Sequence, residues 1–197
     1  MALNQRKSTR WMARVGTWIA RVASLVIIGL KAALNFKAQD GLMVKGEKTA
    51  NFALRRGIYL IADYGLWGLS VALFTTMKAL GFPLLVIFIA LWLFDFLAAG
   101  AFVLFYEKTG EDLSLGEDFR RARDAVDQKS RMAGYSVLLL FVVQSIVWTG
   151  PEKVITFFRK EIGDAQVVSV LLALTGIQAS IWVVLYNLGY GLVVEFF

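Results

Sequence analysis

Histidine and cysteine are both absent from the 197 residues, and proline occurs only twice. Without cysteine there is no disulfide and no thiolate ligand, and without histidine there is no imidazole for a metal, a haem or general-base catalysis. The sequence also has no Gly-x-Ser-x-Gly, Gly-x-Gly-Asp or phosphate-cradling motif. These absences argue against a metal site and against an enzyme.

Charge is scarce as well, with 18% charged residues against about 25% in soluble domains. Hydrophobic residues make up 58%, and the mean hydropathy is +0.62. A soluble protein of 22.0 kDa could not cover its surface with so few charges. The composition therefore predicts an all-α, polytopic membrane protein.

Four apolar stretches are candidates for crossing the bilayer, at residues 57–77, 82–106, 133–149 and 167–194. At about 1.5 Å per residue, stretches of this length reach across most or all of a hydrocarbon core of about 30 Å. Gly81 and Pro83 predict a tight hairpin between the first two. We expect residues 57–197 to form one transmembrane domain of four helices.

Residues 1–56 are expected to form a separate, basic N-terminal segment. On a helical wheel its first basic residues fall within an arc of roughly 120°, with apolar residues such as Trp18 and Val22 elsewhere. This pattern is typical of an amphipathic helix on the membrane surface, and the alternative is a first spanning helix with paired charges. The candidate lipid-headgroup contacts are Arg6, Lys7, Arg10, Arg14, Arg21 and Lys31. Residues 37–56 show no sustained period and predict a polar connection.

The positive charges suggest an orientation. Segments 1–57 and 107–132 carry 17 lysines and arginines, whereas the two opposite connections of a four-span chain carry 4. This bias predicts a multi-pass protein of the cytoplasmic (inner) membrane with both termini in the cytoplasm and the basic segment on the anionic inner leaflet. The basic face carries no recognition motif, which argues against a nucleic-acid partner.

The segment 107–132 predicts a cytoplasmic amphipathic helix between the second and third spans. Ser114 followed by Glu117 has the spacing of a capping box, and a narrow apolar stripe follows. Its polar side is the natural docking surface for a partner. The candidate docking residues are Arg120, Arg121 and Arg123.

Carboxylates inside spans are candidate functional groups because burying them is expensive. Asp95 lies near the middle of the second span, and Asp63 lies about 9 Å inside the first. They suggest a proton or cation relay, and the alternative is a structural hydrogen bond from a neutral Asp to a neighbouring helix. The candidate polar partners on other spans are Gln144, Gln178 and Asn187.

Three tryptophans come from three different spans at similar inferred depths. Trp67, Trp92 and Trp182 could line a cleft for a quinone, a pigment or a lipid tail, and the alternative is packing against each other or against lipid. No cofactor is predicted, and bound lipid is expected.

These features favour a non-enzymatic scaffold or accessory subunit of a larger membrane complex, assembled with other subunits or with copies of itself. The alternative is a small transporter or an ion- or proton-conducting subunit that uses Asp95 and Asp63. A third hypothesis is a membrane-shaping protein in which the amphipathic helix acts as a wedge.

Overall fold

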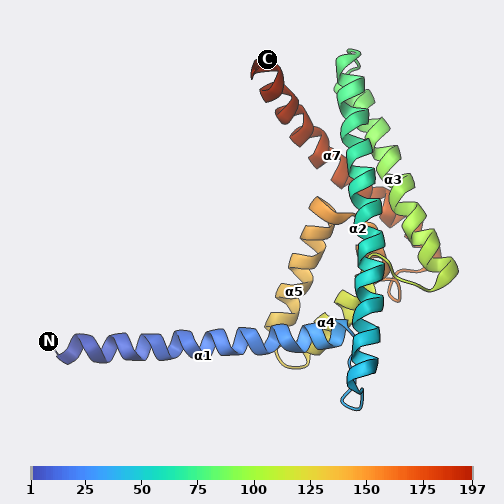
Figure 1. The fold of residues 1–197 in the computed structure, drawn as a ribbon. Helices are drawn as coiled ribbons and strands as arrows, with labels where there is room; N and C mark the ends of the chain where they lie inside the picture. The colour runs from blue at the N-terminus through green and yellow to red at the C-terminus, as the bar shows by residue number, and fades with distance from the viewer. Residues whose placement is uncertain (1, 197) are drawn as a thin grey trace.

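The computed structural model describes the backbone of residues 2–196 and the side chains of residues 17–191, and this part is helical with no strand (Figure 1). The helices are α1 (Ala2–Ala33), α2 (Leu42–Ala79), α3 (Leu84–Thr109), α4 (Gly116–Asp127), α5 (Arg131–Gln144), the π-helical turn η1 (Ser145–Thr149), α6 (Glu152–Phe157) and α7 (Asp164–Phe196). Four stretches within them are long and apolar enough to cross a membrane: Leu42–Ala79, Leu84–Thr109, Arg131–Thr149 and Asp164–Gly191. The expectation of an all-helical fold is confirmed, and the four apolar stretches are compatible with a multi-pass membrane protein.

The first long helix begins much earlier than the sequence predicts. Residues 37–56 were expected to be a polar connection, but α2 starts at Leu42. The connection before it is closed by Asp40, which accepts a hydrogen bond from the Lys37 N–H at 2.7 Å and pairs with Lys48 Nζ at 2.6 Å. At 38 residues, α2 is about 57 Å long, so its first turns lie beyond a hydrocarbon core of about 30 Å. A helix surrounded by water needs no apolar period, which explains why the pattern gave no signal.

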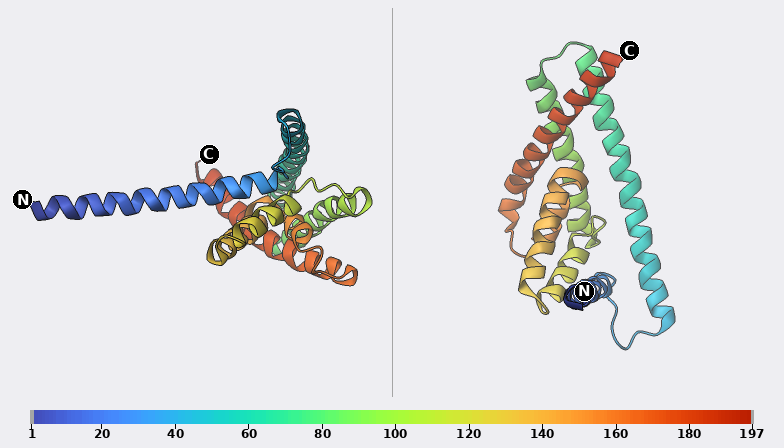
Figure 2. Two further views of the ribbon diagram at one scale, coloured as in Figure 1. Left: turned by 90° about the horizontal axis from the view of Figure 1, so that it is seen from below. Right: turned by 90° about the vertical axis from the view of Figure 1, so that its left-hand side faces the viewer.

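Helix α1 runs across one end of the bundle, at a steep angle to α2, and its N-terminal part projects beyond the other helices (Figures 1 and 2). Its last turns pack on α4, where Gly29 lies against Ala122 and Val126. Arg21 and Lys31 are exposed. The side chains of Arg6, Lys7, Arg10 and Arg14 lie outside the described residues, so their contact with lipid stays a prediction.

The start of α4 differs in detail from the predicted capping box. Leu115 precedes the helix with a φ of 72°, and no side chain of that residue caps it. The Ser114 hydroxyl donates instead to Asp112 Oδ1 at 2.6 Å, and Asp112 Oδ2 accepts the Glu117 N–H at 2.6 Å. Asp112 therefore replaces Ser114 as the capping acceptor, because its carboxylate reaches two donors at once.

Helices α3 and α7 are antiparallel neighbours. Leu91, early in α3, shares a buried cluster with Val183, late in α7. Ala99 and Val103, late in α3, share another with Leu171, early in α7. The end of α7 thus lies beside the α2–α3 hairpin, at the opposite end of the bundle from α1 (Figures 1 and 2).

Residues 131–163 form a return hairpin: α5 leads away from α4, and α6 leads back to it. At Gly134 in α5, an added Cβ would lie 2.6 Å from Asp127 Oδ1 of α4. At Gly116 of α4, an added Cβ would lie 1.9 Å from Thr156 Oγ1 of α6. Both ends of the hairpin therefore contact α4.

Two ion pairs place the residues that follow α6 beside α4 and the end of α3. Glu161 pairs with Arg120 of α4 at 2.5 Å, and Arg159 pairs with Glu107 at the end of α3. Helix α5 and helix α7 consequently start at one end of the bundle. Residues 131–149 remain one of the four stretches that could cross, and the up-and-down order expected for residues 133–149 stays a prediction.

The tip of the return hairpin shows how the chain reverses. The α-helix loosens into the π-helical turn η1, and Gly150 follows with a φ of 102°. A side chain at that φ would be strained, so glycine is suited to the position. Pro151 then precedes α6 as its N-cap residue, where its missing N–H has no cost.

Candidate functional site

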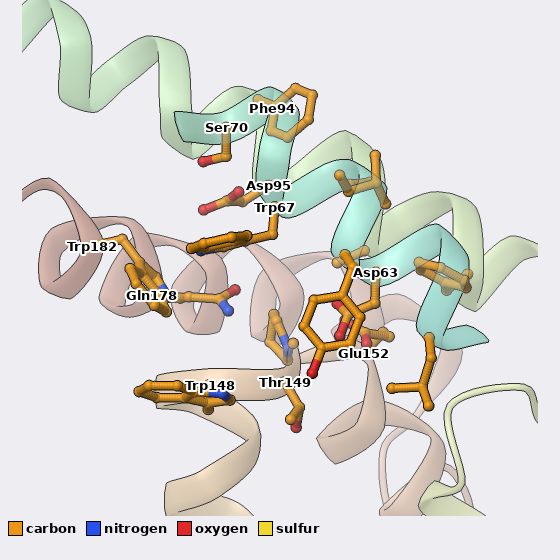
Figure 3. Close-up of a pocket in the computed structure, with 18 of the residues that line it drawn as sticks. Asp63, Trp67, Ser70, Phe94, Asp95, Trp148, Thr149, Glu152, Gln178 and Trp182 are labelled. Carbon is orange, nitrogen blue, oxygen red and sulfur yellow. The ribbon is translucent and has the colours of Figure 1, made fainter. Parts of the chain in front are cut away.

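A cavity of about 370 Å³ lies between α2, α3, α7 and the tip of the return hairpin. It contains an unusual number of polar groups for the interior of a membrane bundle. The polar lining residues are Arg56, Asp63, Ser70, Asp95, Thr149, Glu152 and Gln178 (Figure 3).

Asp95 projects from α3 into this cavity, beside Ser70 and Trp67 (Figure 3). Among the described residues its carboxylate takes part in none of the ion pairs. Ala98 and Ala99, one turn further on, also line the cavity, so small side chains keep the space open next to the carboxylate. The sequence predicted both the carboxylate and the small residues, but not the cavity.

Asp63 lines the same cavity from α2, and Gln178 lines it from α7. Three of the five predicted intramembrane polar residues are thus brought together. Gln144 and Asn187 are not among the residues that line the cavity, so the structure separates them from Asp95.

A buried polar network around Tyr59 of α2 closes the end of the cavity that lies at the tip of the return hairpin, which we call its lower end. Its hydroxyl lies 2.5 Å from the Thr149 carbonyl oxygen and 2.5 Å from Glu152 Oε1. Lys153 Nζ lies 4.6 Å from the centre of the Tyr59 ring, a cation–π distance. This network fixes the tip of the return hairpin against α2.

Glu152 is a site residue that the sequence did not indicate. It lies on the polar side of a short amphipathic segment, which suggested a solvated face, yet all six residues of α6 are buried. Burial raises the pKa of the Glu152 carboxyl to about 7 and lowers the pKa of the Lys153 ammonium to about 8. The only sequence signal was Gly150-Pro151, which marks a turn but not its depth.

Two of the three predicted tryptophans meet at the cavity. Trp67 and Trp182 line it, together with Trp148 at the hairpin tip. The Trp148 and Trp182 rings lie 5.8 Å apart. Trp92 is separate: its Nε1 donates to the Leu172 carbonyl oxygen at 3.1 Å, which joins α3 to α7.

The mouth of the cavity is lateral. Trp67 keeps 49% of its surface uncovered, Tyr64 keeps 64% and Trp148 keeps 67%. All three line the cavity, so it opens sideways, between α2 and the hairpin tip. In a bilayer this opening would face lipid.

The three acids do not form a metal centre. No group of three or more acidic side chains within the described part of the chain is placed to hold a metal ion. The carboxyls come from α3, α2 and α6, and Asp95 lies apart from Asp63 and Glu152, which lie near each other (Figure 3). The arrangement favours protonation of the individual carboxyls, or a general attraction for cations, over coordination of one metal ion by all three.

The predicted docking arginines all lie in ion pairs inside the chain. Arg120 pairs with Glu161, and Arg121 pairs with Asp118, whose carboxyl has a raised pKa because of burial. Arg123 pairs with the neighbouring Asp124 at 2.9 Å. Their charges are therefore partly neutralised on the face where a partner was expected.

The comparisons with known proteins add no relative from which a role could be transferred. No protein-family model, no curated protein and no solved structure matches this chain.

Proposed function

We propose that this protein is a membrane transport subunit that takes up a proton or a small cation in the cavity, with Asp95 as the principal binding group. The observation that carries the proposal is the position of Asp95, mid-helix and facing a cavity without an ion-pair partner in the described residues. Asp63 is a second acid on the wall of the same cavity. This proposal corresponds to the alternative given in the sequence analysis, a small transporter or an ion- or proton-conducting subunit.

The energetic argument concerns the cost of a carboxyl within a bundle. A charged side chain near the bilayer centre costs about 2.5–3.5 kcal/mol even on insertion scales. A structural role would offset this cost with a hydrogen bond to Gln144, Gln178 or Asn187, as the sequence allowed. Gln178 lines the cavity, but none of the side-chain hydrogen bonds found among the described residues joins it to Asp95. A carboxyl without such a hydrogen bond favours a functional explanation.

The proposal includes an orientation. Lys78 is the only one of the 21 lysines and arginines at the end of the bundle that holds the α2–α3 hairpin and the end of α7. The positive-inside rule then supports a cytoplasmic membrane with α1 and α4 on the cytoplasmic side. In this proposal the return hairpin does not cross and the C-terminus lies outside, and the alternative is the sequence-based expectation of two cytoplasmic termini.

The scaffold hypothesis is kept as a second candidate because α1 projects beyond the bundle. Trp18, Ile19 and Val26 on this helix are each more than half exposed. An anionic inner leaflet or a neighbouring subunit could cover them. Co-purification in mild detergent tests this candidate: we expect Val26→Lys to release subunits that the wild type retains, and an unchanged profile would count against it. Membrane shaping stays a prediction from the sequence.

Proton and cation flux through reconstituted protein tests the main proposal. We expect full-length protein in liposomes to acidify the lumen, reported by an enclosed pH dye, when a potassium gradient and valinomycin impose an inside-negative potential. Asp95→Asn should abolish this flux, whereas Asp124→Asn removes an exposed acid of α4 and should leave it intact. Equal flux from the wild type and Asp95→Asn would overturn the proposal.

A further inference from the structure

The wall of the cavity around Asp95 is aromatic, and this bears on the kind of ligand. Trp67 lies next to the Asp95 side chain, with Trp182 across the cavity (Figure 3). The rings of Trp182 and Tyr186 are 5.2 Å apart, and Trp148 extends the same row. Indole and phenol faces attract cations, most strongly where water is excluded.

The charge of the cavity is uneven. At its lower end, Arg56 and Lys153 accompany Asp63 and Glu152, so cations and acids are balanced there. At the Asp95 end, no lysine or arginine lines the wall. The unbalanced negative group therefore lies where the tryptophans are, which matches a ligand that brings its own positive charge.

The lateral mouth indicates how such a ligand arrives. Trp67 and Trp148 line the cavity and are 49% and 67% exposed, so a molecule dissolved in the bilayer can enter beside them without crossing water. A fully hydrated inorganic ion would not partition into lipid, whereas an amphiphile would. A volume of about 370 Å³ falls in the range of small-ligand sites, about 300–1,000 Å³.

We infer that the cavity binds an amphiphilic organic cation, a quaternary or protonated amine with an apolar tail, held by Asp95 and by the faces of Trp67 and Trp182. The inference rests on the proposed function, since it names the substrate class of the same site. The ammonium group lies against the carboxylate and the indoles, and the tail leaves through the lateral mouth. A quinone or a neutral lipid would not use the charge of Asp95.

Equilibrium dialysis against proteoliposomes tests this inference. The probe is hexyltrimethylammonium with full-length protein in phosphatidylcholine vesicles, and empty vesicles correct for partition into lipid. The controls are 1-hexanol, hexanesulfonate and tetramethylammonium, which remove the charge, reverse it or remove the tail. We expect the probe to bind at least about tenfold tighter than each control, since both an ion pair and a desolvated cation–π contact are lost without it.

Variants locate the binding within the cavity. We expect Asp95→Asn to weaken binding of the probe at least about tenfold, and Trp67→Leu to weaken it about fivefold. Trp67→Phe keeps an aromatic face and should retain most of the affinity, which guards against a packing effect. Asp124→Asn and Trp18→Leu are matched changes outside the cavity and should bind as the wild type does.

The outcomes separate this inference from the proposed function. Equal binding of hexanol or hexanesulfonate, tighter binding of a short-chain quinone, or full affinity in Asp95→Asn would overturn the ligand class. If Asp95-dependent proton flux then persists, the transport function stands without it. If the cation binds but no flux is found, the ligand class stands and the transport function is wrong.

Discussion

Arg120 of α4 holds Glu161, 41 residues further along the chain, through nitrogen–oxygen contacts of 2.5 and 2.9 Å. Arg120 also donates to the Phe157 carbonyl oxygen at 3.0 Å, so it reaches both the end of α6 and the segment after it. A four-span, up-and-down chain would place these groups on opposite faces of the membrane. Their contact is the observation that supports our proposal that residues 131–163 turn back before crossing.

Side-specific labelling is the direct test of this arrangement. The chain has no cysteine, so single-cysteine variants report one site each. We expect Glu111→Cys and Lys160→Cys to react with an impermeant maleimide from one face, and Leu80→Cys from the other. If Lys160→Cys labels together with Leu80→Cys, the segment crosses and the return hairpin is wrong.

Charge exchange tests the Arg120–Glu161 pair itself. Glu161 is 53% exposed in its side chain, so we expect Arg120→Glu to lower the free energy of unfolding by only about 0.5–1 kcal/mol. The double variant Arg120→Glu/Glu161→Arg should restore most of it, measured by denaturant unfolding in mild detergent. A loss that the exchange does not restore would mean that the pair contributes nothing.

The same variants bear on the docking hypothesis for α4. If Arg120, Arg121 and Arg123 dock a partner, reversing their charge should release it while leaving membrane insertion intact. Because each arginine pairs within the chain, reversal also disturbs α4. If Arg120→Glu/Glu161→Arg restores binding of the partner, the single reversal had disturbed the fold of α4. If binding is not restored, the partner contacts the arginine itself.

The parts of the fold that depend on the properties of a single helix could be predicted from the sequence. Hydropathy and length identified all four apolar segments, and Gly81 and Pro83 marked the hairpin. The path of α5 was not predictable in this way, because 19 apolar residues have the same composition whether they cross or turn back. Positive charge bears on this choice, because Lys153, Arg159 and Lys160 lie in a connection that the sequence analysis assigned to the outer side and that our proposal returns to the cytoplasmic side.

The close approach of α4 and α6 leads to a further prediction. An added Cβ at Gly116 would lie 2.6 Å from the Lys153 carbonyl oxygen and 2.7 Å from the Phe157 nitrogen. Backbone atoms cannot yield easily, so we expect Gly116→Ala to cost about 1–3 kcal/mol of unfolding free energy. Gly68→Ala, in open space on α2, is the control and should be neutral or slightly stabilising. Equal stability of the two variants would contradict the packing of the return hairpin on α4.

Glu152 should make stability depend on pH. Its pKa is raised by burial from 4.5 to about 7, so the folded state holds the proton more tightly than the unfolded state. The stability contributed below pH 4.5 is therefore lost as the pH rises towards 7. Glu152→Gln keeps an oxygen for the Tyr59 hydroxyl and should remove this loss.

The free energy of unfolding, measured in mild detergent between pH 4 and 7.5 for the wild type and Glu152→Gln, tests this pH dependence. Lys153 acts in a different window, because its pKa is lowered from 10.5 to about 8 and its influence falls above that range. A pH slope that is the same in the wild type and in Glu152→Gln would show that Glu152 is not buried as described.

The candidate site was predictable only in part, since a sequence gives depth along a helix but not rotation between helices. Asp95 and Asp63 were identified because an acid inside a span is costly. Trp92, at a depth similar to that of Trp67, faces α7 instead of the cavity. Glu152 was missed because its burial depends on α6 returning beneath α2, which no local pattern encodes.

The return hairpin is fixed by residues that the ribosome supplies at very different times. Asp127 and Gly116 are made before α5, whereas Thr156, Arg159 and Glu161 follow it. The ion pair and the close backbone approach that hold the end of the hairpin on α4 can therefore form only after residue 161 has been synthesised.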